Sequence, residues 1–302
     1  MELNSFQEKM RHFLPEIELR FAEPMSRHTS LRIGGPAEVM VFPQNPQELA
    51  HILKVSKELD ITCAILGAGT NILAPDEGCR GVVICLKDCL GGMELLPGNC
   101  IRVMAGVTMA RAAVFAANHG LSGLEFAHGI PGTVGGGVYM NAGAYGGEMS
   151  GICRSVTLMD GAGQLREVNA RELEFSYRHS KLQESGEIVI SAVLQLQPAA
   201  PEEIKQKMRE LQAKRLASQP LDYPSAGSAF KRPAGGYAAA LIDQAGLRGF
   251  RVGQAAIARK HAGFAVNLGG ATAAEMRELL TQVSDRVFRQ TGIRLEPEIR
   301  IW

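Results

Sequence analysis

Apolar side chains in the first half of the chain alternate between helical and strand spacing. Residues 3–14 and 46–59 carry apolar positions at helical spacing, and Asn45 followed by Pro46 is a typical helix start. The runs ITCAIL, GVVICL and IRVMAGV are short and apolar, as expected of buried strands. A further helix is predicted over TMARAAVFAANHG, ending at Gly120. The pattern therefore predicts an intermixed arrangement of helices and strands.

The second half shows a hairpin, a domain boundary and a second mixed region. RSVTLMDGAGQLREV is typical of a hairpin turning at Asp160 and Gly161, and EIVISAVLQLQ of a long strand. Near Pro198 the chain becomes a charged amphipathic helix, which indicates a domain boundary. The last long helix is predicted to begin with a capping box formed by Thr272 and Glu275. Strict alternation of polar and apolar residues in IRLEPEIRIW predicts a final strand. The elements of the whole chain together predict an α+β protein.

Composition narrows the class of protein. The chain has 302 residues, 46% hydrophobic and 21% charged, with a net charge of +1. That balance lacks the basic patch expected of a protein that binds nucleic acid or a membrane surface. The N-terminus shows no signal peptide, and glycines and Pro131 exclude the uncharged stretch 126–147 as a transmembrane helix. We therefore expect a cytoplasmic protein that does not insert into membranes. The sequence does not determine its oligomeric state.

The six cysteines show no pattern of a metal site or a disulfide framework. None forms a C-x-x-C pair, and most lie in apolar runs such as VVICL. A buried free thiol behaves as a small hydrophobic side chain. We expect reduced, structural thiols and no bound metal.

Glycine is concentrated in GLEFAHGIPGTVGGGVYMNAGAYGG, residues 123–147, and in the shorter loop LGAGTN. Each loop follows an apolar run, and consecutive backbone N–H groups in such loops can bind anionic oxygens. Neither loop completes G-x-G-x-x-G, because Ile72 stands where the third glycine is needed, and no P-loop is present. Two interpretations remain at this point: backbone holding a pyrophosphate-bearing ligand, or tightly packed structural loops.

Seven motifs in order resemble the shorter form of the UDP-N-acetylenolpyruvoylglucosamine reductase family, which lacks a tyrosine-rich insertion. They are TSLRIGGPAEV, LGAGTNIL, the glycine-rich stretch, YRHS, PSAGSAFKRP, KHAGFAVN and LEPEIRI. The resemblance covers nearly the whole chain. It implies an enzyme of bacterial peptidoglycan synthesis, in which NADPH reduces FAD and the substrate UDP-N-acetylglucosamine enolpyruvate becomes UDP-N-acetylmuramate.

The resemblance also implies the fold and the cofactor contacts. It implies the FAD-binding fold of the para-cresol methylhydroxylase type, with subdomains 1–86 and 87–200, and an α/β substrate-binding domain over 201–292. The strand 293–302 is expected to return to the second subdomain. FAD is expected to bind non-covalently, because no histidine follows the first loop. The implied cofactor-binding residues are Gly67, Ala68, Gly69, Thr70, Asn71, Gly129, Ile130, Pro131, Gly132, Thr133, Gly135, Gly136, Asn141, Ala142 and Gly143.

Three residues match the family's catalytic positions. Ser228 matches the proton donor, although a serine in this loop could equally bond local backbone. Arg178 matches the arginine that holds the substrate carboxylate, a role that suits a guanidinium fork. Glu298 matches its acidic partner, yet the alternation in IRLEPEIRIW is also explained by a half-buried strand with ion pairs.

Residues expected to contact substrate match the family less closely. Arg232 stands where the longer form has asparagine, which leaves the clamping of the diphosphate open. His128 and His261 lie in motif loops, where a histidine is more often packed than catalytic, and neither is given a role. The expected substrate contacts are Tyr145, Gln219, Lys231, Arg232 and Arg300.

Two rival functions remain open from the sequence. Another FAD oxidoreductase of this fold, acting on a hydroxy acid or a sugar lactone, would keep both glycine loops without needing Ser228, Arg178 and Glu298 together. A non-catalytic nucleotide-binding module would need only the packing. The colour of the purified protein separates the flavin-binding functions from the last.

Overall fold

The computed structural model describes residues 2–302. These residues divide into two compact units, each assembled from segments that are distant in the sequence. The division expected from the sequence, with boundaries after residues 86 and 200, stays a prediction. The first unit holds the described residues up to Ala22, Glu38–Ala68 and Arg80–Ala213; the second holds Glu23–Ala37, Gly69–Cys79 and Lys214–Trp302.

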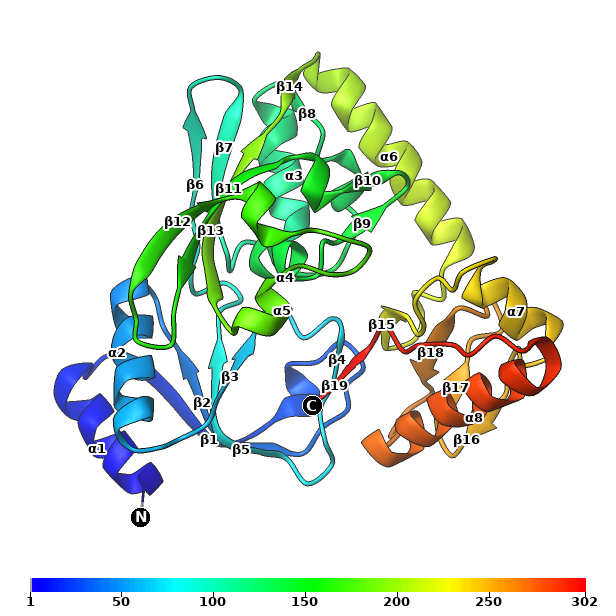
Figure 1. The fold of residues 1–302 in the computed structure, drawn as a ribbon, viewed down its shortest axis with the longest axis horizontal. Coiled ribbons are helices and arrows are strands. Elements are labelled where there is room, and N and C mark those ends of the chain that lie inside the picture. The colour runs from blue at the N-terminus through cyan, green and yellow to red at the C-terminus, as the bar shows by residue number, and fades with distance from the viewer. Residues whose placement is uncertain (1) are drawn as a thin grey trace. The chain divides into compact units, whose positions relative to one another are not determined.

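One sheet of the first unit has the order β1-β2-β5-β3 and carries two helices on one side (Figure 1). Buried Phe6 and Met10 of α1 share a core with Ile52 of α2 and with strand residues such as Val39 and Ile84. Asn45 accepts the N–H of Glu48 and so begins α2 as predicted. The elements are α1 (Glu2–Phe13), β1 (Glu18–Pro24), β2 (Pro36–Phe42), α2 (Pro46–Glu58), β3 (Cys63–Leu66) and β5 (Cys79–Cys85).

The second sheet of this unit is antiparallel, in the order β12-β11-β13-β7-β6. The predicted hairpin is confirmed: Asp160 accepts N–H bonds from Ala162 and Gln164, and these bonds lower the pKa of its carboxyl. Helices α3 and α4 share the apolar core of this sheet. The elements are β6 (Met93–Leu96), β7 (Cys100–Met104), α3 (Met109–Asn118), α4 (Val134–Tyr139), β11 (Cys153–Met159), β12 (Leu165–Asn169) and β13 (Ile188–Gln195).

The second unit is built on the sheet β15-β18-β17-β16, with α7 and α8 packed against it. The predicted capping box is confirmed, because Thr272 and Glu275 bond each other's backbone N–H groups at the start of α8. Leu31, Ile33 and Leu73 complete the same core from segments far away in the sequence. The elements are β15 (Ser225–Ser228), α7 (Ala238–Gln244), β16 (Arg251–Val252), β17 (Ala255–Ile257), β18 (Phe264–Asn267) and α8 (Ala273–Thr291).

The C-terminal segment forms less strand than its alternation predicts. Regular pairing is confined to β19 (Arg300–Ile301), which runs parallel to β4 (Ile72–Leu73). Upstream, Pro297 makes a single bridge to Phe230. Proline has no N–H to donate to a ladder, which explains why the strand does not extend through this position. Alternating burial persists only in part, since Leu295 and Ile299 are buried but Ile301 is 43% exposed.

Short elements complete the described chain, and the charged segment after Pro198 forms the long helix α6 as predicted. None of the helices within residues 2–302 is long and apolar enough to cross a membrane. The remaining elements are η1 (Met25–Arg27), β8 (Leu121–Ser122), η2 (Glu125–Ala127), β9 (Gly143–Ala144), β10 (Gly147–Glu148), η3 (Met149–Gly151), η4 (Ala170–Leu173), α5 (Leu182–Ser185), β14 (Gln197–Pro198) and α6 (Pro201–Ser218).

Asp76 caps α8 from a distant segment, which the sequence did not reveal. Its carboxylate accepts the backbone N–H groups of Ala273 at 2.7 Å and Ala274 at 3.0 Å. A carboxylate here satisfies orphan donors and the positive end of the helix dipole. We expect Asp76→Ala to lower the free energy of unfolding by about 1 kcal/mol in urea denaturation. Glu77→Ala is the control, and an equal loss there would contradict the capping role.

Candidate functional site

The two glycine loops touch each other inside the first unit. Gly67 follows β3, and a Cβ at this position would lie 2.7 Å from the Thr133 hydroxyl oxygen. A side chain therefore has no room at residue 67. Thr133 itself is only 2% exposed and accepts the N–H of Gly136, which starts α4. The apolar strand β3 and the cap of α4 thus bring the predicted cofactor residues Gly67 and Thr133 into contact.

Much of the second glycine loop is a short helix, although the sequence indicated a loop. The glycines of α4 allow close packing, because a Cβ at Gly135 would meet that of Ala105 at 2.9 Å. The N–H groups of Val134 and Gly135 already donate to Val107 and Ala105. The interpretation of tightly packed structural backbone thus holds for the glycines of this helix, and ligand binding by the rest of the loop stays a prediction. Gly132, before the helix, has a φ of 147°.

The first glycine loop continues into the second unit at Gly69. This residue has a φ of 62°, and a Cβ there would lie 1.9 Å from the carbonyl oxygen of His28. Two residues further, the Asn71 side chain donates to the carbonyl oxygen of Glu298 at 3.1 Å. The Asn71 carbonyl in turn accepts the N–H of Arg300. A predicted cofactor residue therefore holds the backbone on both sides of Ile299.

The segment of Ser228 runs beside that of Glu298 in the second unit. The N–H of Glu298 donates to the carbonyl of Ala229 at 2.9 Å, and the N–H of Lys231 donates to that of Glu296 at 2.8 Å. Ser228 is exposed at the end of β15, whereas Glu298 is half-buried. Two predicted catalytic residues thus belong to one pair of hydrogen-bonded segments.

Glu296 has a definite partner that the sequence did not reveal. Its carboxylate lies 2.5 Å from the Lys231 ammonium, and the Glu296 side chain is 69% exposed. This pair engages a residue expected to contact substrate. An exposed ion pair contributes about 0–1 kcal/mol, so an anionic ligand can displace Glu296 at little cost.

Arg178 lies in the first unit, in a tight turn with unusual backbone geometry. Ser176 and His179 exchange both backbone hydrogen bonds, which leaves Tyr177 and Arg178 as the central residues of the turn. Arg178 has a φ of 56°, a region that costs a non-glycine residue about 1–2 kcal/mol. Its guanidinium donates to the carbonyl oxygen of Gly143 at 2.9 Å. Such strain is found at functional sites when surrounding contacts maintain it.

The residues after α4 support this turn. Asn141 is 1% exposed, and its side chain donates to Ser176 O and accepts from Ser150 N. The side-chain amide of Asn141 therefore already has two hydrogen-bond partners within the protein. The expected contact of this residue with FAD stays a prediction. Tyr145 is 47% exposed at the tip of the β9–β10 hairpin, with a φ of 52°. Four predicted site residues, Asn141, Gly143, Tyr145 and Arg178, are thus neighbours.

The remaining expected substrate contacts lie in the second unit and have local partners. The Gln219 side chain accepts a bond from Arg215 at 3.3 Å, a neighbour that sequence reasoning missed. The Arg232 guanidinium lies 4.1 Å from the centroid of the Tyr237 ring. Arg300 is exposed on β19. Arg215 lies in the last turn of α6, and Gln219 follows the end of that helix four residues later, so the two side chains meet as i, i+4 neighbours.

His261 and the cysteines show properties of structural residues. Burial, assisted by the charge of Arg248, lowers the pKa of His261, and its Nδ1 accepts the N–H of Gly263. The six cysteines are free thiols. Burial raises the pKa of Cys153 to about 12, which keeps its thiol protonated and unreactive near neutral pH.

Two family models match most of the chain. One, described as the C-terminal domain of UDP-N-acetylenolpyruvoylglucosamine reductase, matches residues 219–302, and the other, an FAD binding domain, matches residues 37–169. The UDP-N-acetylenolpyruvoylglucosamine reductase of Agathobacter rectalis is 44% identical, over 98% of both chains. That of Streptococcus pneumoniae (strain Hungary19A-6) is 43% identical, also over 98% of both chains.

A solved structure agrees with these sequence matches. The UDP-N-acetylenolpyruvylglucosamine reductase of Thermus caldophilus aligns with a TM-score of 0.78 and 36% identity, covering 95% of this chain and 99% of that one. The predicted fold class is confirmed: an α+β protein with an FAD-binding domain of the para-cresol methylhydroxylase type.

Proposed function

The chain belongs to the UDP-N-acetylenolpyruvoylglucosamine reductase family, and from this premise we propose how its residues carry out the family's reaction. The enzyme is an FAD-dependent oxidoreductase that reduces the enolpyruvyl group of a UDP-sugar, a step of peptidoglycan synthesis, with NADPH as reductant. We place the activity in the cytoplasm, where NADPH is available. The product is UDP-N-acetylmuramate.

The observation that carries this proposal is that family models match both the FAD-binding part, residues 37–169, and the C-terminal part, residues 219–302. The matched C-terminal domain model covers Ser228 and Glu298, and the relatives align over 98% of the chain. A different flavin oxidoreductase of the same fold would explain the match of the FAD binding domain over residues 37–169, but not the match over residues 219–302. The reductase is therefore favoured over a hydroxy-acid or sugar-lactone oxidoreductase, and over a non-catalytic nucleotide-binding module.

The glycine loops fit FAD. Gly67 has no room for a side chain, because a Cβ there would lie 2.7 Å from the Thr133 hydroxyl oxygen, and the residue is partly exposed. We assign the contacts with FAD to residues 67–71, 129–136 and 141–143. Because Val134 and Gly135 already donate within the protein, the N–H groups for the pyrophosphate come from earlier in the second loop. When bound, FAD relays a hydride from NADPH to the substrate.

Arg178 holds the carboxylate of the enolpyruvyl group in this proposal. Negative charge grows on that carboxylate as hydride arrives at the terminal carbon, and a guanidinium fork stabilises it through two hydrogen bonds. The strained turn fixes the starting point of the side chain. Fixed donors stabilise developing charge without having to reorganise.

Ser228 donates the proton that completes the reaction, and Glu298 acts beside it. The serine O–H delivers a proton to the carbon next to the carboxylate, forming the lactyl ether. The Asn71 side chain donates to the Glu298 carbonyl, and the Glu298 N–H donates to the Ala229 carbonyl, so the backbone is held on both sides of the Glu298 Cα. We propose that Glu298 interacts with Arg178 and the reacting group in the complex, where a nearby cation permits its negative charge.

The diphosphate and sugar are assigned to the other expected contacts. Lys231 and Arg300 supply charge for the diphosphate, and displacement of Glu296 frees Lys231 for it. Arg232, Gln219 and Tyr145 are the remaining proposed contacts. This set replaces the clamp that the longer family form builds from its tyrosine-rich insertion.

A direct assay tests the function. Purified protein should show flavin absorption bands and should oxidise NADPH only when UDP-N-acetylglucosamine enolpyruvate is added. Mass spectrometry should detect a product heavier by two hydrogens. A yellow protein that does not consume NADPH with this substrate, yet reacts with a hydroxy acid or a sugar lactone, would contradict the proposal. It would favour the alternative FAD oxidoreductase.

Gly132→Val tests the backbone cradle. The φ of 147° at this position is closed to a β-branched residue, so the loop must change path. We expect flavin retention after purification to fall at least about tenfold while the protein stays folded. Acid precipitation of the unaltered protein should release all flavin to the supernatant, because no covalent bond is proposed.

A matched glycine outside the loops provides the control. Gly161→Val changes the tip of the β11–β12 hairpin, where an added Cβ meets no heavy atom within 4 Å. Its flavin content should match that of the parent protein. Equal flavin loss in both variants, or flavin remaining in the acid pellet, would contradict the cradle or the non-covalent attachment respectively.

A further inference from the structure

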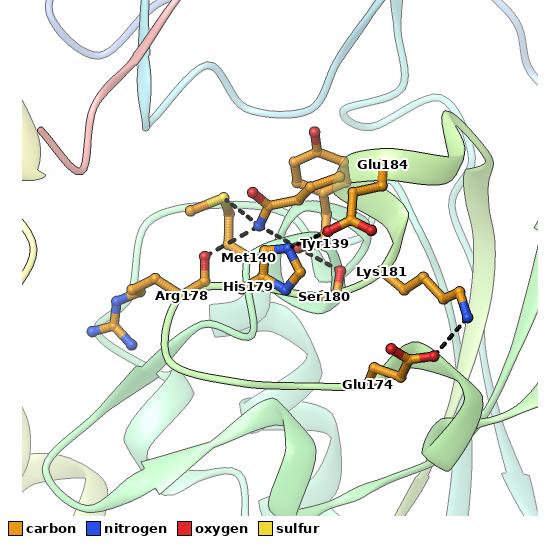
Figure 2. A network of polar contacts seen from close by, with 9 residues as sticks. Tyr139, Met140, Glu174, Arg178, His179, Ser180, Lys181 and Glu184 are labelled. Atoms are coloured by element: carbon orange, nitrogen blue, oxygen red, sulfur yellow. Dashed lines mark hydrogen bonds and ion pairs between the residues drawn. The ribbon is translucent and has the colours of Figure 1, made fainter. Parts of the chain in front are cut away.

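A single glutamine, Gln183, joins the turn that carries Arg178 to the end of α4. Figure 2 shows Arg178, Ser180 and Tyr139 close together in this region. The Gln183 side-chain nitrogen lies 3.1 Å from the Arg178 carbonyl oxygen and 3.2 Å from that of Tyr139. The Ser180 hydroxyl donates to the same Tyr139 carbonyl at 2.7 Å. Residues 176–183 are thus tied to the end of a helix that begins inside the glycine-rich stretch.

The chemistry of this junction requires a donor with two N–H groups. The two nearest partners of the Gln183 nitrogen are carbonyl oxygens, which only accept hydrogen bonds, and the third, the Met140 sulfur at 3.8 Å, is a weak acceptor. A carboxylate in the same place would face them with oxygen and repel them. An aliphatic side chain would remove the amide bonds to the Tyr139 and Arg178 carbonyls. Of the natural side chains with this length and shape, glutamine alone satisfies both acceptors.

The bond to Arg178 acts on a strained residue. Rotation about ψ of Arg178 turns its carbonyl group, and the backbone there has a φ of 56°. A non-glycine residue leaves this region readily unless other contacts hold it. By fixing the carbonyl, Gln183 opposes that rotation, and the guanidinium keeps its place against the Gly143 carbonyl. The glutamine therefore acts on the direction of the Arg178 side chain without touching the guanidinium.

We propose that Gln183 is a positioning residue for the reductase reaction, which holds Arg178 in the conformation that receives the substrate carboxylate. This rests on the role of Arg178 proposed above. The sequence offers no signal for it, because a glutamine five residues after an arginine matches no motif. Its contribution follows from α5 (Leu182–Ser185), which returns the chain to the end of α4.

The test measures substrate binding to the oxidised, FAD-loaded full chain, without NADPH, by calorimetry. We expect Gln183→Leu to raise the substrate dissociation constant about tenfold. NADPH should reduce the flavin of this variant at the normal rate. Gln183→Glu, which keeps the size but cannot donate when ionised, should be at least as weak. Gln206→Leu removes a hydrogen-bonded glutamine from exposed α6 and should bind normally.

A double-mutant cycle with Arg178→Ala separates positioning from general damage. If Gln183 acts through Arg178, then Gln183→Leu adds no further loss of affinity once the guanidinium is gone. An independent structural effect would multiply the two losses and would overturn the inference. Gln183→Met enters the cycle if the leucine variant fails to fold.

The same cycle distinguishes the two proposals. Normal binding by Arg178→Ala would overturn the proposed role of Arg178, and this inference with it. Weak binding by Arg178→Ala together with normal binding by Gln183→Leu would overturn only the positioning role.

Discussion

Ser228→Ala is expected to leave the reduction of flavin by NADPH near its normal rate and to slow the reoxidation of flavin by substrate about 10²–10⁴-fold. A positioned proton donor contributes on this scale, and the proton is needed only when the enolpyruvyl group is reduced. Stopped-flow absorption of the flavin follows each half-reaction separately. Because Ser228 is exposed at the end of β15, the alanine variant should fold and retain flavin.

Ser225→Ala is the matched control for this prediction. Ser225 begins the same strand and pairs with Val266, so its removal perturbs β15 without removing the proposed donor. Its two half-reactions should both stay near normal. If Ser228→Ala slowed both half-reactions equally, or if Ser225→Ala behaved like it, Ser228 would be a structural residue of the loop.

Glu298→Gln should slow reoxidation of the flavin by substrate on the order of 10²-fold, with folding and flavin content unchanged. The amide keeps the shape but removes the charge. The backbone bonds at Glu298, from its N–H to Ala229 and from Asn71 to its carbonyl, do not involve the side chain. A loss of activity in this variant therefore reports on the carboxylate. Thermal unfolding and flavin absorption monitor the fold in parallel.

Glu296→Gln is the comparison within the same segment. It removes an exposed ion pair with Lys231, which contributes about 0–1 kcal/mol to stability. We expect near-normal turnover, with any change confined to substrate affinity, because Lys231 loses its competing carboxylate. Similar behaviour of the two variants would mean that Glu298 is an ion-pair residue of the C-terminal segment.

Local patterns predicted the elements whose stability arises from nearby residues. Asn45 begins α2, Asp160 turns the β11–β12 hairpin, and the box of Thr272 and Glu275 begins α8. In each case the side chain bonds backbone within four residues, so the sequence contains both partners. The C-terminal alternation overpredicted a strand, because Pro297 interrupts the ladder and the partners of this segment come from 71–73 and 229–231.

The glycine-rich stretch shows where a local pattern becomes ambiguous. The composition indicated that backbone must approach something, without saying what. In the structure, Gly135 approaches Ala105, a contact between segments thirty residues apart. Thr133 then begins a helix that the run of glycines did not suggest. Which glycines serve packing and which serve a ligand depends on these distant neighbours.

By itself the sequence determined the family, the α+β class and the capped or turn-forming elements, because motifs and local hydrogen bonds lie along one stretch of chain. Only the tertiary structure decided which distant side chains support the turn of Arg178, the segment of Glu298 and the start of α8. Gln183 meets Tyr139, Asn71 meets Glu298, and Asp76 meets Ala273 across gaps of 44, 227 and 197 positions. A hydrogen bond acts over about 3 Å, so such partners are defined by the path of the folded chain.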